Sequence, residues 1–497
     1  MAATVALSGC VDAVQGGGGG GEIDHSVLNL ALAGEPGSWN PAMLTSAGDV
    51  RWRWMAVYDT LLRAEPGGKV VPGAAESYDF SEDAKTLTMK LRSGMKFSDG
   101  NPVDSAAVKA SIVNMQNGGG TDASRVAGLT IETPDDLTVI LKSPEPRGQL
   151  PVFMSFSTGV VASPAALKSK DVDNTPVSSG PYVLDVANTT SGSVYTFNKR
   201  PDHWEADRYP YQKLVLTVMT DLNARVNALR AGQVSGASID REVAAEAEAS
   251  GIKVTKRVNS WLGLYIMDRN GKRTKALGDK RVRQAMNMVF NRDDIATGLY
   301  QGEATPTTQI FNPETPAYLK ELDGRYPYDV EKAKQLMADA GYADGFSLTI
   351  PAQSPDTDQA NPLIIQQLGL LNIKVTEKPL SGPTAINDIL SGKFDVLYAW
   401  IGMADPLFDT VQSLVPDAVW NTSKATDPRL SEMVTKAEVL TGAEADANFQ
   451  EINRFCVEEA WFVPWVNAKF YFGLDREDRI SGNTDYFQTT PLLWDFQ

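Results

Sequence analysis

The sequence predicts an α/β protein built from more than one domain. Its 497 residues exceed what one ordinary core organises, and 42% of them are apolar, which supports large globular cores. Segments with the two-residue period of strands alternate along the chain with segments that have the spacing of amphipathic helices. Between residues 346 and 400 this alternation is strict, which implies a mostly parallel sheet flanked by helices.

The N-terminal third of the chain begins with a strand. Residues 27–32 have the pattern of a strand that enters the first core. Residues 86–91 and 137–142 then alternate polar and apolar side chains, and turn-forming residues lie between them. We therefore expect a small α+β subdomain between about residues 60 and 170.

Helices with clear start signals follow this region. A strand at 214–218 leads to Asp221, which is placed to cap a helix that stops at Gly232. Residues 282–290 carry apolar side chains on one helical face, and Asp329 is placed to cap the next helix. The same alternation therefore continues into the second half of the chain.

The strict alternation lies in the second half and has a consequence for ligands. In open parallel sheets, ligands bind at the carboxyl ends of the strands, and here this rule points to the segment after Trp400. The elements that we expect are strands at 346–350, 373–377 and 394–400, with helices that end near Leu371 and Gly392.

Composition excludes several classes of function. A net charge of −16 argues against binding nucleic acid. With two cysteines, two histidines and no Cys-x-x-Cys pair, the chain lacks a zinc site built on such pairs. A Ser-His-Asp enzyme would depend on His25 or His203, and we interpret each as a surface or capping residue. The acidic pairs Asp293-Asp294 and Glu458-Glu459 lie on helical patterns and are interpreted as surface charges. We expect no cofactor.

The two cysteines have different surroundings. Cys456 shares a helical face with Phe449 and Ile452, which predicts a buried side chain. Cys10 ends the sequence Leu-Ser-Gly-Cys, which resembles the lipobox of bacterial lipoproteins, and the glycine run 16–21 is typical of a flexible tether. No basic residue precedes Arg51, so either the translation start lies upstream or the leader was trimmed. We predict lipid modification of Cys10.

A series of short segments follows along the chain in the order found in one known protein family. The most specific ends in Phe-x-Asp-Gly-x-Pro at residues 97–102, and residues 35–41 read Glu-Pro-Gly-Ser-Trp-Asn-Pro. Together the series resembles the family 5 extracellular solute-binding proteins, the dipeptide, oligopeptide and nickel receptors of ABC importers. Residues 58–62 look like that family's helix after the first strand. The segments are 35–41, 58–62, 91–102, 179–182, 202–204, 281–285, 291–293 and 340–346.

The resemblance implies a bilobal fold similar to type II periplasmic binding proteins, with an extra α+β subdomain on lobe one. The lobes would close over a solute and present it to a membrane permease. The receptor would be a monomer, held by its lipid at the outer face of the cell membrane or in the periplasm. The implied divisions are a leader remnant and Gly-rich tether at 1–26, lobe one at 27–60, 170–262 and 471–497, its subdomain at 61–169, and lobe two at 263–470.

The resemblance also suggests a ligand class. In peptide-binding relatives, an acid shortly after the tryptophan of the last sheet strand holds the ligand's α-ammonium group. Here Met403 occupies the expected position, and Asp405 either substitutes for that acid or caps the next helix, which we favour. A peptide or peptide-like solute is the first expectation. An oligosaccharide is the alternative, because aromatic rings stack on sugar faces, and a cell-envelope hydrolase is a weaker one. A receptor that signals to a partner would have the same sequence.

The expected site lies between the two lobes. We predict that three tryptophans converge on it, with a fourth at the hinge, and that two acids reach the ligand from opposite lobes. The competing interpretation is that each tryptophan packs in its own core; it is strongest for Trp465 and weakest for Trp400. The predicted ligand contacts are Glu35, Trp39, Trp261, Trp400, Met403, Asp405 and Trp465.

Overall fold

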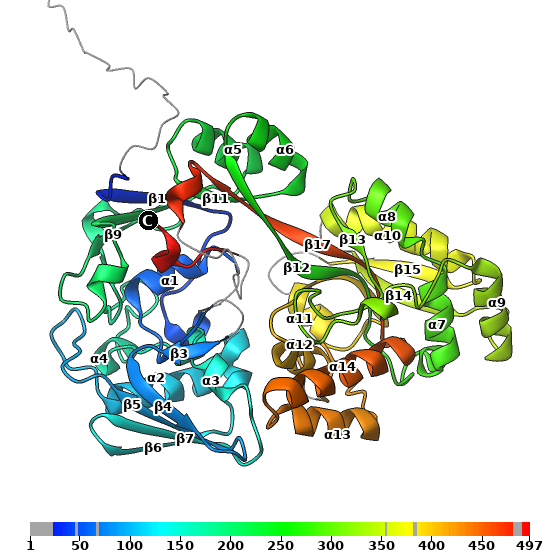
Figure 1. Ribbon diagram of the computed structural model, residues 1–497, viewed down its shortest axis with the longest axis horizontal. Helices are drawn as coiled ribbons and strands as arrows, with labels where there is room; N and C mark the ends of the chain where they lie inside the picture. Colours follow the sequence, from blue (N-terminus) through cyan, green and yellow to red (C-terminus); the bar gives the residue numbers. More distant parts are fainter. Residues whose placement is uncertain are drawn as a thin grey trace, which may run out of the picture.

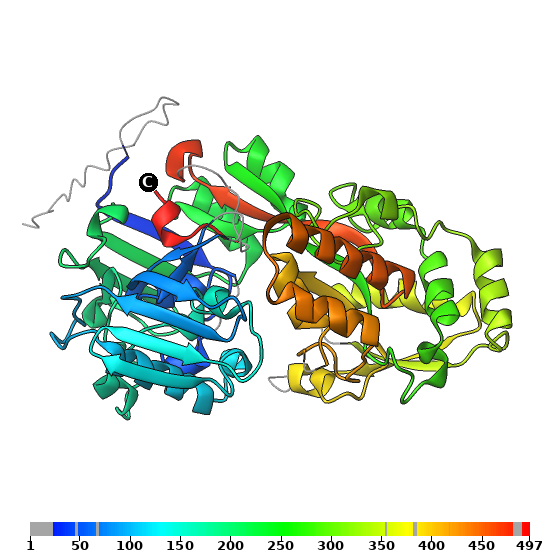
Figure 2. The ribbon, with the colours of Figure 1, turned by 60° about the horizontal axis from the view of Figure 1, so that its bottom comes forward.

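The computed structural model describes residues 23–44, 48–65, 69–352, 355–380, 385–416, 418–480 and 490–497. Two lobes lie side by side, joined by the long strands β12 (Lys253–Ile266) and β17 (Phe462–Leu474) (Figures 1 and 2). We call first lobe the part with β1–β11, α1–α6 and residues 490–497, and second lobe the part with α7–α14. Within the described ranges, no helix combines the length and apolarity needed to cross a bilayer.

The largest sheet of the described residues has nine strands and runs through both lobes. Its order is β16-β12-β17-β11-β1-β10-β9-β8, and β13 pairs with β17. Strand β1 is parallel to β10 and β11, whereas β17 is antiparallel to β11 and β12. The remaining strands are β1 (Val27–Leu32), β8 (Tyr182–Leu184), β9 (Val194–Lys199), β10 (Lys213–Val218), β11 (Gly236–Ile239), β13 (Thr305–Pro306) and β16 (Val396–Gly402).

The first lobe has a core on each face of this sheet. Leu28, Leu30 and Leu32 of β1 are buried against α1 (Arg51–Val57) on one face. On the other face the sheet packs under α5 (Leu222–Arg230) and α6 (Arg241–Ala249). The Asp221 carboxylate accepts a hydrogen bond from the Ala224 N–H at 2.8 Å, which starts α5 as expected.

A smaller sheet forms the subdomain of the first lobe. Four antiparallel strands in the order β4-β5-β7-β6 pack against α2, which Asp104 caps by accepting from the Ala107 N–H at 2.8 Å. The elements here are β2 (Leu62–Ala64), β3 (Val70–Pro72), β4 (Ala75–Phe80), β5 (Thr86–Leu91), α2 (Ser105–Asn117), β6 (Thr130–Asp135), β7 (Thr138–Lys142), α3 (Leu150–Phe153) and α4 (Pro164–Leu167).

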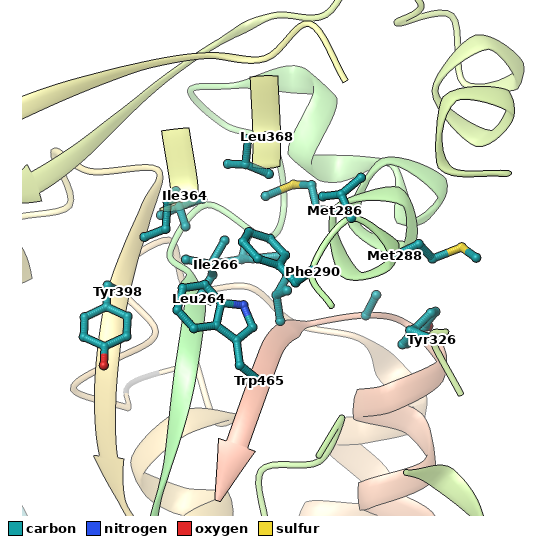
Figure 3. Packing of buried hydrophobic residues seen from close by; sticks show 14 of the residues in the cluster. Leu264, Ile266, Met286, Met288, Phe290, Tyr326, Ile364, Leu368, Tyr398 and Trp465 are labelled. Atoms are coloured by element: carbon teal, nitrogen blue, oxygen red, sulfur yellow. The ribbon is translucent and has the colours of Figure 1, made fainter. Parts of the chain in front are cut away.

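The second lobe surrounds the other end of the sheet with helices. In its main core, Trp465 lies against Phe290 and Tyr398, with ring centroids 4.9 and 5.7 Å apart (Figure 3). Its elements are α7 (Lys280–Met288), α8 (Arg292–Gly298), α9 (Val330–Asp339), β14 (Ser347–Ala352), α10 (Pro355–Gly369), β15 (Lys374–Pro379), α11 (Ala385–Leu390), α12 (Pro406–Ser413), α13 (Pro428–Ala437) and α14 (Gly442–Glu458).

The two lobes are linked where β12 and β17 run antiparallel. Their register shifts between Val258 and Ser260 and again between Leu262 and Gly263. At the second shift the backbones approach so closely that a Cβ on Gly263 would lie 2.8 Å from the Cα of Pro464. A glycine is therefore required at this point of the connection.

Most elements expected from the sequence are confirmed, and two are wrong. Residues 58–62 are not helical: α1 ends at Val57, and the chain then runs extended into β2. The second-half sheet is not one parallel sheet, because among the described strands of that half only β14 and β15 pair in parallel. Strand β16 instead pairs antiparallel with β12, so the last strand of the alternation completes the long sheet.

Candidate functional site

A pocket opens in the first lobe, beside the second lobe. Its enclosed volume is about 50 Å³, well below the roughly 300–1,000 Å³ of sites that enclose a whole small ligand. Helix α1 and the segment that enters β2 form two walls, and residues 155–156 and 492–494 form the others. The lining residues are Arg51, Trp54, Met55, Tyr58, Asp59, Thr60, Arg63, Ala64, Ser155, Phe156, Tyr209, Leu492 and Trp494.

Five of the thirteen residues that line the pocket are aromatic. The Tyr58 hydroxyl donates to the Trp39 carbonyl at 3.1 Å, which fixes the tyrosine ring. Tyr209 and Trp494 meet edge to face, with ring centroids 6.5 Å apart. Burial raises the pKa of both Tyr58 and Tyr209, so their hydroxyls stay neutral at physiological pH. Such walls suit a ligand with apolar or flat parts.

A buried carboxylate lies at the floor of the pocket. Asp59 is 4% exposed and accepts from Trp204 Nε1 at 3.0 Å and from His203 Nε2 at 3.1 Å. Burial alone would raise the pKa of Asp59, but His203, Arg63 and Trp204 outweigh it and lower the pKa below its usual value. This carboxylate is therefore ionised and fully paired.

The interpretation of His203 as a surface or capping residue is wrong. Its side chain is buried, because the segment 202–204 folds back onto Asp59, which is 144 residues earlier. The other ring nitrogen, Nδ1, accepts from the Glu205 N–H at 3.3 Å, so the proton lies on Nε2. Both nitrogens are thus engaged, and neither is open to act as a base toward a bound molecule.

Arg63 connects the floor of the pocket to its aromatic wall. Its guanidinium pairs with Glu205 and lies over the rings of Trp204 and Trp494, at 4.9 and 5.0 Å from their centroids. Burial alone would lower the pKa of Arg63, but the surrounding acidic groups raise it instead. The polar part of the pocket is therefore preformed and nearly charge-balanced.

The rim of the pocket touches the second lobe. Phe156 packs edge to face on Phe408 of α12, with ring centroids 6.3 Å apart. Arg125 lies beside both rings, at 5.6 and 5.5 Å from their centroids. The pocket is thus lined by the first lobe alone, and one of its lining residues, Phe156, contacts the second lobe.

The structure does not bring the predicted tryptophans together. Trp39 is 3% exposed, with Arg53 over its ring at 3.9 Å, and Trp261 and Trp465 are 1% and 0% exposed in two separate cores of the second lobe. This corrects the expectation that these rings converge on a cleft. Strand residues alternate between two faces, and both faces of β12 and β17 are covered.

Trp400 differs from the other three. Its side chain is 48% exposed on β16, opposite Leu262 of β12. Three residues on, Met403 is buried, and its N–H donates to the Asn259 carbonyl at 2.7 Å. Glu35 is exposed on the first lobe. Of the predicted contacts, Trp400 and Glu35 are therefore exposed, and Asp405 is half-buried.

Asp405 caps a helix, as we favoured. One of its carboxylate oxygens accepts from the Leu407 and Phe408 N–H groups at 3.0 and 3.1 Å, which starts α12. Asp409, one turn later, is 3% exposed. The Oδ2 atoms of both aspartates are buried and have no hydrogen-bond partner among the described residues. Burial raises the pKa of both, and repulsion from Asp405 adds to the rise at Asp409.

Sequence reasoning missed most of this pocket. Asp59 and His203 lay in two of the segments that carried the family resemblance, yet nothing in a single sequence pairs positions 144 residues apart. The signal available was that each segment joins a charged side chain to aromatic neighbours. Within the described part of the chain, no group of three or more His, Cys, Asp or Glu side chains is placed to hold a metal ion.

Comparison with known sequences identifies the family. Residues 69–418 match the profile of "Bacterial extracellular solute-binding proteins, family 5 Middle". The chain belongs to this family. A curated relative of this family 5 protein is the glutathione-binding protein GsiB of Salmonella paratyphi A, which is 30% identical over 302 residues. That match covers 59% of this chain and 57% of GsiB, so it spans little more than half of the relative's length.

Solved structures confirm the fold of this family 5 protein. The PBP AgaA of A. tumefaciens R10, in complex with agropinic acid, superposes with a TM-score of 0.78 at 24% identity, over 95% of this chain and 96% of AgaA. The periplasmic binding protein DppA of Helicobacter pylori, in complex with the peptide STSA, gives a TM-score of 0.77 at 21% identity, over 95% and 97%. The bilobal α/β architecture expected from the sequence is therefore shown.

Proposed function

We propose that this protein is the extracytoplasmic receptor of an ABC importer, which binds a solute between its two lobes and delivers it to a membrane permease. The match to the family profile across residues 69–418 carries this proposal. The pocket supports it, because its lining residue Phe156 contacts Phe408 of the second lobe, so a movement of the lobes would reach the site.

The proposed ligand is a peptide or a peptide-like solute. The relatives' names include a glutathione-binding protein and a complex with the peptide STSA. The pocket suits an apolar or aromatic side chain of such a molecule, because five of its thirteen lining residues are aromatic. Exposed Trp400, Glu35 and the helix cap formed by Asp405 are proposed as additional contacts from the two lobes.

An oligosaccharide is the second candidate. The half-exposed ring of Trp400 and the aromatic pocket walls favour it, because flat rings stack on the apolar faces of sugars. We rank it below a peptide because the pocket floor is already paired with protein groups. A sugar would have to satisfy its many hydroxyls elsewhere.

We further propose that the protein is not an enzyme. Both ring nitrogens of His203 are occupied, so this histidine cannot activate a nucleophile. Cys456 is buried, and burial raises the pKa of its thiol to about 12, so the thiol stays protonated and unreactive. Incubation with candidate peptides should leave them chemically unchanged in mass spectra. A cleaved product would support the cell-envelope hydrolase instead.

We propose that Cys10 carries a lipid anchor and that the protein acts as a monomer at the outer face of the cell membrane. Cys10 lies outside the described residues, so the proposal depends on the Leu-Ser-Gly-Cys box and the glycine tether. Mass spectrometry of the N-terminus from native membranes should find a diacylated cysteine. An unmodified, fully active soluble protein would contradict it.

The lobe boundaries given above are proposed in the same way. Residues 253–266 and 462–474 cross between the lobes as β12 and β17, and the proposed boundaries at 262/263 and 470/471 fall within these strands. Limited proteolysis with mass analysis of the fragments would test them. Because sheet pairing protects the backbone at these boundaries, we expect cleavage only beside β12 and β17. Cleavage inside either strand would contradict the proposal.

A thermal-shift screen tests the ligand class. Glutathione, di- to pentapeptides and oligosaccharides are compared, each at 100 µM to 10 mM. A cognate solute at 100 times its Kd adds about 2.7 kcal/mol of stability, which raises the melting temperature clearly. Stabilisation by peptides alone supports the first candidate, and stabilisation by sugars alone supports the second. Uptake by cells that lack the gene then tests transport, because loss of uptake without loss of extracellular turnover separates a receptor from a hydrolase.

A further inference from the structure

The two lobes touch at a second place, away from the pocket. The N–H of Gly148, in the turn before α3, donates to a carboxylate oxygen of Glu438, the residue that follows α13. Glu438 is thus held by a backbone group of the other lobe. Figure 1 shows α3 at the edge of the first lobe that faces α12 and α13, and Figure 2 shows the same proximity after rotation.

This contact requires a glycine. A Cβ on Gly148 would lie 2.8 Å from the carbonyl carbon of Glu438 and 3.0 Å from its Cα, and closer still to its carbonyl oxygen. All of these atoms are backbone atoms, so no side-chain rotation relieves the overlap. The segment around Gly148 therefore approaches the second lobe as closely as its smallest side chain permits.

Arg147 supports the segment from within the first lobe. Its Nη1 donates to the carbonyls of Arg125 and Ala127, each at 3.2 Å, and its charge favours the ionised form of Glu438 across the junction. Burial raises the pKa of Glu438, an effect that the Gly148 N–H and Arg147 oppose. Glu438 is thus anchored by its partners in the first lobe.

The aromatic contact at the pocket rim lies on the same side. Phe408 of α12 packs among Phe156 and Phe153 of the subdomain core, with Arg125 over all three rings at 5.5 to 5.6 Å. Asp405, three residues before Phe408, caps the helix that carries this ring. Two contacts made entirely by groups of this chain, one apolar and one polar, therefore join the subdomain to α12 and α13.

We propose that these contacts form a clasp, made by Gly148 with Glu438 and by Phe156 with Phe408, that holds the lobes together in the absence of solute. The clasp sets the resting population of the closed form, so a ligand shifts an equilibrium that already leans toward closure. It depends on the fold and not on the ligand's identity. If the proposed transport function proved wrong, the clasp would be unaffected. If the clasp proved wrong, the proposed transport function would be unaffected.

Small-angle X-ray scattering of the purified full chain without ligand tests the clasp. Gly148→Ala should increase the radius of gyration, because the added methyl group drives the lobes apart. Gly119→Ala is the matched control: it lies in the same subdomain, and a Cβ there meets nothing within 4 Å. The control should scatter like the wild type. A wild-type radius for Gly148→Ala would overturn the proposal, and an equal increase in both variants would also overturn it.

Hydrogen exchange keeps the test decisive if Gly148→Ala folds poorly. In Phe408→Ala, which removes the apolar contact and leaves Gly148 in place, amides of residues 147–156 should exchange at least several-fold faster than in the wild type. Amides of the paired strands β5 and β7 report whether the subdomain stays folded, and they should not change. Unchanged exchange at 147–156 in a folded Phe408→Ala protein would contradict the clasp.

Discussion

Buried aspartates on the two sides of the lobe junction have pKa values that are shifted in opposite directions. In the first lobe, Asp59 receives hydrogen bonds from His203 and Trp204 and has Arg63 nearby, so its pKa is lowered despite burial. In the second lobe, Asp409 keeps one oxygen unpaired among the described residues, and its pKa is raised well above the usual value. The carboxylate of Asp59 is therefore already stabilised by its partners, whereas protonation or a new partner would stabilise that of Asp409.

Removing the paired carboxylate of Asp59 should have the largest effect on the free energy of unfolding. Asp59→Ala leaves Arg63 buried with fewer acidic partners and leaves the Trp204 and His203 donors without their acceptor. Loss of one partner from a buried charge pair costs about 3–5 kcal/mol. Thermal and urea denaturation should show this loss, and Asp207→Ala, an exposed aspartate in the same region, should show almost none. A loss below about 1 kcal/mol would mean that the first lobe is not built around this pair.

The uncompensated carboxylate should respond in the opposite direction. Asp409→Asn removes a buried charge and keeps a side-chain oxygen for its two donors, the Ala404 N–H at 3.0 Å and Gln412 Nε2 at 3.1 Å. We expect a gain of roughly 1 kcal/mol at pH 7, because the neutral amide avoids the desolvation and repulsion that the carboxylate suffers. The melting temperature is the measurement. A destabilised variant would show that Asp409 has an undetected partner, and the contrast between the lobes would then be lost.

Acidification should separate the two aspartates further. When the folded-state pKa lies above the unfolded value, stability rises as the pH falls toward the unfolded value, so the cost of burying Asp409 should decrease as the pH is lowered from neutral toward about 4. Asp59 has a lowered pKa, so its contribution is lost only below about pH 4.

The measurement is the difference in stability between the wild type and Asp409→Asn across that pH range. Burial raises the pKa of Asp495 to about 6, but this group is common to both proteins and cancels in the difference. The advantage of Asp409→Asn should shrink as the pH falls. A constant difference would mean that Asp409 does not titrate in this window.

The smallest expected effect on stability is at Trp400. Because its side chain is 48% exposed, Trp400→Ala should change the free energy of unfolding by no more than about 0.5 kcal/mol. With a cognate solute from the screen, it should weaken binding by at least ~1 kcal/mol. Tyr328→Ala, an equally exposed ring before α9, is the matched control and should leave affinity unchanged. Equal affinity in both variants would remove Trp400 from the site.

The sequence predicted the periodic elements well because their signals are local. The apolar face of α7, the aspartate caps of α5 and α9 and the strand at 27–32 all depend on neighbours within a few residues. Strand partners are not encoded locally. The strand after Gly392 was therefore assigned to a parallel sheet, although it pairs with β12, which lies more than 100 residues earlier.

The site was predicted less well for the same reason. A tryptophan at the end of a strand fits a core and a cleft equally well, and three of the four proved to be buried. The pocket floor joins Asp59 to His203 across 144 residues, a pairing that only the folded chain displays. Asp405 was assigned correctly because a cap is read from the residues that immediately follow it.

The two crossing strands also set the order in which the protein can be completed during synthesis. The core of the first lobe contains Leu30 from its first strand and Phe472 and Phe496 from the end of the chain. The second lobe is one continuous stretch between β12 and β17. At ribosomal speeds of roughly 5–20 residues per second, the early strands wait tens of seconds for their last partners. We therefore expect nascent chains halted before Phe472 to hold a folded second lobe beside an unfinished first one.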